Sequence, residues 1–142
     1  MKGSKDILSS ILKTTQMGQI GIRSILKNEL KPNLRTELNS QLKEYDTIES
    51  EAHGIAISRG WKLKELDPAI KGMTNMMTRT RLSFGNADSK AAAMMIQGNT
   101  RGIIKGFKNL NQFPSKDKAV SDLAQKLIDF EETNNRQLQG FL

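Results

Sequence analysis

Apolar residues recur every three or four positions along most of the chain, the spacing that places them on one face of an α-helix. The first such stretch predicts a helix of about 25 residues beginning at a cap on Ser4. Its apolar stripe is Ile7, Ile11, Gly18, Ile22 and Ile25. A second helix is predicted from a cap at Asn33 to about Ser58, with the stripe Leu34, Leu38, Leu42, Tyr45, Ala52 and Ala56.

The second half of the chain continues the same pattern. Asp67-Pro68 predicts the start of a short third helix that ends at Gly85. A fourth helix is predicted from Asp88 or Ser89 to about Leu110, with the inward residues Ala92, Ala93, Ile96, Thr100, Ile103, Phe107 and Leu110. Pro114-Ser115 predicts the start of a fifth, with the stripe Val120, Leu123, Leu127, Asn134, Leu138 and Phe141.

No stretch shows the alternation of a β-strand. The predicted fold class is therefore all-α: four long helices and one short connecting helix in a single domain spanning residues 1–142. Gly60 is expected to end the second helix, and Trp61, Leu63 and Leu66 to fold back onto the core.

Three glycines recur every four residues in the fourth helix, at positions 98, 102 and 106, on a face next to its apolar stripe. A glycine inside a helix costs up to about 1 kcal/mol relative to alanine. We therefore expect close backbone packing along this glycine face.

Two carboxylates fall inside apolar stripes: Glu49, one turn beyond Tyr45, and Glu131 in the fifth helix. Burying a carboxylate is costly unless it has a partner. The sequence therefore predicts polar partners for both on the facing helices.

A weak internal repeat relates the two halves. Gln19-x-x-x-Arg23-Ser24-Ile25-Leu26-Lys27 matches Gln97-x-x-x-Arg101-Gly102-Ile103-Ile104-Lys105, and Glu49 and Glu131 follow at similar distances. Chance similarity between helical heptads is the alternative explanation. A duplication predicts two antiparallel hairpins, with a long link that lets the second pair return in the same sense as the first.

Two hairpins joined by a long crossover, with a carboxylate inside each, resemble the ferritin-like superfamily. In that family each hairpin supplies a Glu and a Glu-x-x-His that together hold two iron or manganese ions. The Gly18-Gln19-x-Gly21 segment and the linker containing Trp61 are similar to a small bacterial, stress-associated branch of it.

The chain departs from that ligand set in both hairpins. In the first, Gln19 stands in place of Glu, and Glu49 is kept but its histidine position is Ala52. In the second, Gln97 again replaces Glu.

The second Glu-x-x-His motif keeps Glu131 but has Asn134 where the histidine belongs. Amide oxygens bind such metals weakly, so the resemblance implies a degenerate site at Gln19, Glu49, Gln97, Glu131 and Asn134. We expect the two glutamines to hydrogen-bond the two glutamates instead. The lone histidine, His53, is one residue past the motif and is expected at the surface or its boundary; as a ligand it is the alternative.

Composition narrows the classes of function. Cysteine is absent, which excludes a disulfide framework and a thiolate site. No apolar run approaches membrane-spanning length and no signal-peptide core begins the chain, so a cytoplasmic protein is expected. A phosphate-binding loop and a catalytic triad are also missing.

We therefore expect a non-enzymatic structural or interaction protein, with a homodimer as a candidate assembly and no cofactor. The alternative is a protein that binds Fe, Mn or Zn weakly at a partial site. A further alternative is an association with DNA or another polyanion, because the formal net charge is +7. The 22 basic residues are scattered without runs or interleaved aromatic residues, which favours a solvated basic surface.

The charge pattern generates a testable expectation. If the net charge only reflects a solvated surface, duplex DNA will bind weakly, and added salt will abolish the binding because it rests on counterion release. Fluorescence anisotropy with labelled duplex at rising salt measures this. Tight binding that persists at physiological salt would favour the polyanion alternative.

Overall fold

The computed structural model describes residues 3–66, 85–113 and 117–142. Within these ranges the chain forms four α-helices and no strand: α1 (Ser4–Leu26), α2 (Pro32–Arg59), α4 (Ala87–Gln112) and α5 (Lys118–Gln139). The all-α prediction is confirmed for this part of the chain. The short helix predicted between Asp67 and Gly85 lies almost entirely outside the described residues.

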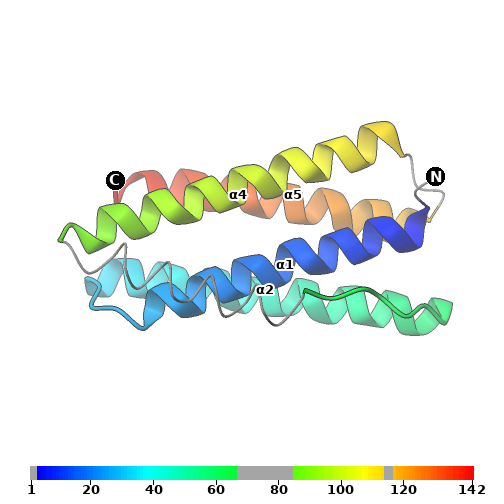
Figure 1. The fold of residues 1–142 in the computed structure, drawn as a ribbon, viewed down its shortest axis with the longest axis horizontal. Coiled ribbons are helices and arrows are strands. Elements are labelled where there is room, and N and C mark those ends of the chain that lie inside the picture. The colour runs from blue at the N-terminus through cyan, green and yellow to red at the C-terminus, as the bar shows by residue number, and fades with distance from the viewer. Residues whose placement is uncertain (1–2, 67–84, 114–116) are drawn as a thin grey trace.

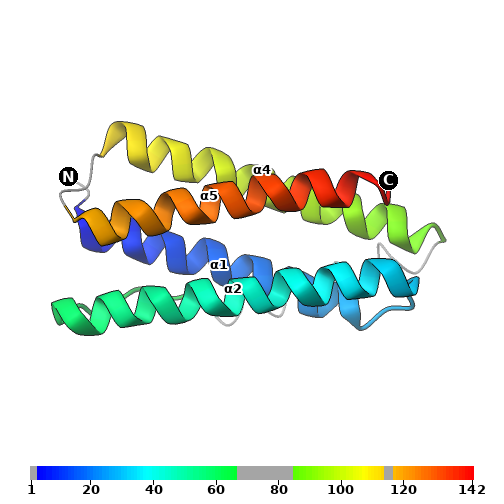
Figure 2. The same cartoon turned by 180° about the vertical axis from the view of Figure 1, so that it is seen from behind.

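The helices form a bundle of two stacked hairpins (Figures 1 and 2). Antiparallel neighbours α1 and α2 make one hairpin, and α4 and α5 make the other. Across the bundle, α1 packs on both α4 and α5, and α2 packs on α5. The short turns within each hairpin dictate this antiparallel pairing.

The direction of the second hairpin differs from the prediction. Figure 1 shows that α4 runs opposite to α1 and parallel to α2, so the second pair does not return in the same sense as the first. α4 starts at the end of the bundle where α2 also starts, so residues 60–86 join the end of α2 to a helix that begins at the opposite end of the bundle.

Local signals set most helix ends. Gly60 ends α2 in the left-handed conformation, at φ 69°, as its position predicts. Each of the four predicted helix starts is displaced by one to three residues: the N-caps of α1, α2, α4 and α5 are Gly3, Lys31, Asn86 and Asp117. Gly3 precedes α1, its N–H donating to Asp6 3.0 Å away. Asp117 caps α5 by accepting from the Ala119 N–H at 3.1 Å.

The segment after Gly60 folds back onto α1, as expected. The Lys64 N–H donates to the Ser9 hydroxyl and the Leu66 N–H to the Gln16 side chain, both at 3.2 Å. Trp61 and Leu63 are half-buried against the core. These contacts hold the first part of the long connection against α1.

The core follows the predicted stripes in α1, α2 and α5 but only in part in α4, where Ala92 is buried and Ile96 and Leu110 are partly buried against the core. The buried residues of α4 are Ala91, Ala92, Met95, Asn99 and Asn109. Thr100 is exposed and Phe107 is 40% exposed, although both were predicted to point inward. The error has a physical cause: the glycine face packs inward in place of the larger apolar face, because it lets α4 approach its neighbours closely.

Three glycines mark these close approaches. A Cβ at Gly102 would stand 2.3 Å from Glu131 Oε1, and one at Gly106 would stand 2.7 Å from Ile128 Cγ1. In α1, a Cβ at Gly18 would stand 2.3 Å from Tyr45 Cζ. The close packing predicted for the glycine face is confirmed at positions 102 and 106. At Gly98 a Cβ would meet nothing within 4 Å.

The contact at Gly18 predicts a measurable cost. Gly18→Ala should destabilise the protein by about 1–3 kcal/mol, since the new methyl group overlaps a rigid, buried ring. Gly54→Ala is the matched control, because its Cβ would meet nothing within 4 Å. It should stabilise α2 by up to about 1 kcal/mol. Urea unfolding of both variants measures the difference, and equal effects would contradict the packing described here.

Candidate functional site

A buried polar cluster joins three helices at the middle of the bundle. Glu131 on α5 is 2% exposed, and its Oε2 lies 2.9 Å from the hydroxyl of Tyr45 on α2. The same hydroxyl lies 3.0 Å from Oδ1 of Asn99 on α4. We call Tyr45, Asn99 and Glu131 the central network. Its members lie far apart in sequence, so the contacts fix how α2, α4 and α5 are placed against one another.

The protonation of Glu131 follows from its surroundings. Burial raises the pKa of this carboxyl from its ordinary value of 4.5 to about 8, with the Tyr45 hydroxyl opposing the rise in part. Burial, and then the charge of Glu131, raises the pKa of Tyr45 well above 10. At neutral pH both groups are therefore uncharged. The Tyr45 hydroxyl has one hydrogen for two neighbours, and the neutral carboxyl supplies the second hydrogen that the two contacts need.

The central network leaves some of its polar atoms without a partner among the described residues. These are Glu131 Oε1 and Asn99 Nδ2, and the adjacent Asn134 Nδ2 is in the same condition. Asn134 is 3% exposed. Buried polar atoms of this kind are uncommon. The network is thus satisfied on the side of Tyr45 and open on the side of Glu131 Oε1.

A second polar cluster joins α1 and α2. Buried Gln19 donates from Nε2 to Glu49 Oε1 at 3.3 Å and to Asp46 Oδ1 at 2.9 Å. Arg23 lies 3.6 Å from the same Asp46 oxygen. The predicted hydrogen bond between Gln19 and Glu49 is present. Asp46 was missed because it lies outside the apolar stripe of its helix.

The structure separates the other predicted residues. Gln97 is exposed, in contrast to its predicted place beside the stripe, and Asn99 takes the position next to Glu131. Glu49 is half-buried and pairs with Gln19, while Glu131 is deeply buried and pairs with Tyr45. His53 is half-buried on α2.

Two signals in the sequence point to the members that were missed. Tyr45 lies in an apolar stripe, where a buried hydroxyl requires a partner. Asn99 shares a helix face with Gly102 and Gly106, and this face becomes visible once the glycines are read as the inward side.

The donor set does not fit the pair of metal ions that the family resemblance implies. Within residues 3–66, 85–113 and 117–142, no three His, Cys, Asp or Glu side chains are grouped to hold a metal ion. One oxygen of Glu131 is already bonded to Tyr45, and the side chains beside it are amides. The two glutamates belong to separate clusters.

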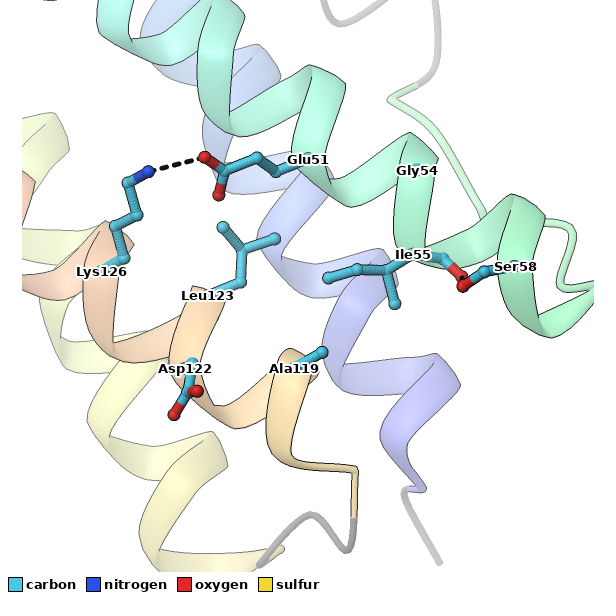
Figure 3. A pocket seen from close by; sticks show the side chains of 8 residues that line it. All are labelled: Glu51, Gly54, Ile55, Ser58, Ala119, Asp122, Leu123 and Lys126. Atoms are coloured by element: carbon cyan, nitrogen blue, oxygen red, sulfur yellow. Dashed lines mark hydrogen bonds and ion pairs between the residues drawn. The ribbon is translucent and has the colours of Figure 1, made fainter.

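A surface groove of about 450 Å³ lies between α2 and α5 (Figure 3). Lys126 and Glu51 form an ion pair of 2.6 Å across it, beside Leu123 and Ile55. Nearby, Arg59 binds Asp117 through two nitrogens at 2.8 and 3.1 Å, which lowers the pKa of the Asp117 carboxyl. Exposed ion pairs contribute about 0–1 kcal/mol each. These ion pairs connect α2 to α5. The described residues that line the groove include no buried polar group.

Comparisons with known proteins add no relative: no family model, curated protein or solved structure matches the chain. In the described part, none of the helices combines the length and the apolar character needed to cross a membrane. The residues themselves therefore carry the functional argument.

The raised pKa of Glu131 predicts a dependence of stability on pH. The folded state holds this proton up to about pH 8, whereas the unfolded state releases it near its ordinary pKa. The contribution of Glu131 is therefore present below pH 4.5 and is lost as the pH rises to about 8. Relative to Glu131→Gln, the wild type should lose at most about 1.4 kcal/mol per pH unit over that window.

Urea unfolding of both proteins at several pH values measures this difference. Glu132→Gln, which removes the neighbouring carboxyl, should keep the pH dependence of the wild type. A constant free-energy difference between wild type and Glu131→Gln at all pH values would show that Glu131 is not held neutral.

Proposed function

We propose that this chain is a ferritin-like bundle in which polar side-chain networks stand in place of the dinuclear metal site, and that it acts as a non-catalytic structural or interaction protein. The arrangement of the helices supports the ferritin-like part. Two antiparallel hairpins are joined through residues 60–86, and α4 runs parallel to α2.

One observation supports the proposed loss of the metal site: the Glu131 carboxyl is hydrogen-bonded to Tyr45 and is uncharged. Its Oε2 lies 2.9 Å from the phenol hydroxyl, and its pKa is raised to about 8. A carboxyl that keeps its proton is a poor ligand for a divalent cation, which must displace that proton to bind. The phenol thus already takes one of the two oxygens of Glu131.

The first hairpin supports the same proposal. Gln19 donates to both Glu49 and Asp46, so the two carboxylates are satisfied by an amide and by Arg23. A glutamate at position 19 would instead add a third negative charge there. The substitution of Gln for Glu therefore suits a cluster without a metal ion.

A structural role follows from what the central network connects. Buried hydrogen bonds between helices fix register and discourage alternative packings more than they add stability. Exposed Ile104 and Phe107, 50% and 40% accessible on α4, support the interaction role, with a homodimer as the proposed assembly. The stress-associated context rests on the family resemblance alone.

The alternative is a protein that binds one divalent cation weakly. It is favoured by Glu131 Oε1, which is buried and has no partner among the described residues. In this alternative the cation replaces the proton of Glu131, and one carboxylate with neighbouring amides holds it with low affinity.

Metal analysis separates the two. Purified protein should contain no stoichiometric iron, manganese or zinc by elemental analysis. Added Mn²⁺ should leave the thermal midpoint of unfolding unchanged, because a ligand stabilises a fold only if it binds the folded state. A ligand present at 100 times its Kd would raise the free energy of unfolding by about 2.7 kcal/mol.

Glu131→Gln is the control for the metal experiment. It keeps most hydrogen-bonding capacity but removes the ionisable carboxyl. A rise in the midpoint with Mn²⁺ that disappears in Glu131→Gln would establish the metal-binding alternative and overturn the proposal.

A further inference from the structure

A groove of about 630 Å³ lies between α1 and α4, on the open side of the central network. Asn99 and Glu131 line its floor, and Met17, Met94 and Met95 line its walls. The exposed, positively charged Arg101 also lines it. The volume falls in the usual range for small-molecule sites, and such sites combine apolar walls with a few convergent polar groups.

The polar floor is the feature that points to a ligand. Asn99 is 1% exposed and Glu131 is 2% exposed, and Asn99 Nδ2 and Glu131 Oε1 lack partners among the described residues. Oε1 lies only 2.3 Å from the point where a Cβ on Gly102 would stand, and Gly102 itself lines the groove. The Glu131 carboxyl therefore fills the space that a side chain at position 102 would take, and this oxygen lies against α4 beneath the groove.

The walls are apolar and leave room. A Cβ at Gly98 would meet nothing within 4 Å, and one at Gly21 would meet only Met95 Sδ, at 3.4 Å. Methionine side chains are flexible and polarisable, so they adapt to ligands of different shape. An apolar body of moderate size fits between them.

The charge of the mouth has one sign. Arg101 and Lys105 line the groove, and Glu131 is the only acidic residue among its described lining residues. Glu131 keeps its proton at neutral pH, as argued above. An anion at the mouth therefore meets the positive charge of the exposed Arg101.

We propose that the groove between α1 and α4 is a binding site for a small organic anion with an apolar body. Its anionic group lies at the mouth by Arg101, and its body lies against the methionine walls. Its uncharged inner end lies against the floor that Asn99 and Glu131 form. This proposal shares the neutral state of Glu131 with the proposed loss of metal binding, and adds to it a ligand and a binding site.

Anilinonaphthalene sulfonate is a suitable probe, because it joins an apolar aromatic body to a sulfonate. Isothermal titration calorimetry at neutral pH should show one molecule bound per chain. Phenylnaphthylamine, the same body without the sulfonate, should bind with an affinity at least about tenfold lower, since it lacks the charge-assisted contact.

Two substitutions locate the site. Gly98→Leu places a side chain in the open space of the groove and should weaken binding of the sulfonate by about tenfold or more. Gly54→Leu is the matched control: its Cβ also meets nothing within 4 Å, but it lines the groove between α2 and α5. Its affinity for the probe should equal that of the wild type.

The charge is tested by Arg101→Gln, with Lys43→Gln on the exposed surface of α2 as its control. Arg101→Gln should reduce the advantage of the sulfonate over phenylnaphthylamine, and Lys43→Gln should not. No binding, several probes per chain, an unchanged affinity in Gly98→Leu, or equal losses in Gly98→Leu and Gly54→Leu would each overturn the proposal. None of these results bears on the metal analysis, so the two proposals fail separately.

Discussion

The hydrogen bond between Tyr45 and Glu131 depends on two glycines that have no polar role. The Tyr45 ring lies where a Cβ on Gly18 would stand, and the Glu131 carboxyl lies where a Cβ on Gly102 would stand. Without these gaps, neither side chain reaches the centre of the bundle. The Tyr45 ring and the Glu131 carboxyl fill the space that side chains at positions 18 and 102 would take. The packing of the core and the polar contact therefore depend on each other.

The neutral state of Glu131 explains how a bundle of this size holds a carboxyl in its core. An ionised carboxylate there requires a cation or several donors, and Tyr45 alone supplies one hydrogen. Retaining the proton removes the charge and adds the missing hydrogen. Glu49 lies nearer the surface, where it is half-buried and accepts a hydrogen bond from Gln19. The two glutamates that the repeat aligns thus occupy different environments.

The sequence predicts the fold class, the helix ends at Gly60 and near Ser4, and the burial of Glu131, because each follows from local spacing or backbone preference. The sequence does not predict which face of α4 packs inward, because two of its faces compete for that place. One is large and apolar, the other is small, and hydrophobicity alone selects the wrong one. The misplacement of Gln97 follows directly from that rotation. Asn99 was missed for the same reason, because its role exists only once α4 turns its glycines inward.

The same rotation of α4 links the core to the surface between α1 and α4. A helix that packs through Gly102 and Gly106 approaches α5 closely, but it brings little side-chain volume to fill the space toward α1. The open side of the central network and the groove beside it therefore have one cause. Larger residues on that face would close the groove, yet they would also push α4 away from α5 and break the contact between Asn99 and Tyr45. The packing that places the buried acid at the centre of the bundle is what leaves one of its oxygens without a partner among the described residues, beneath the groove.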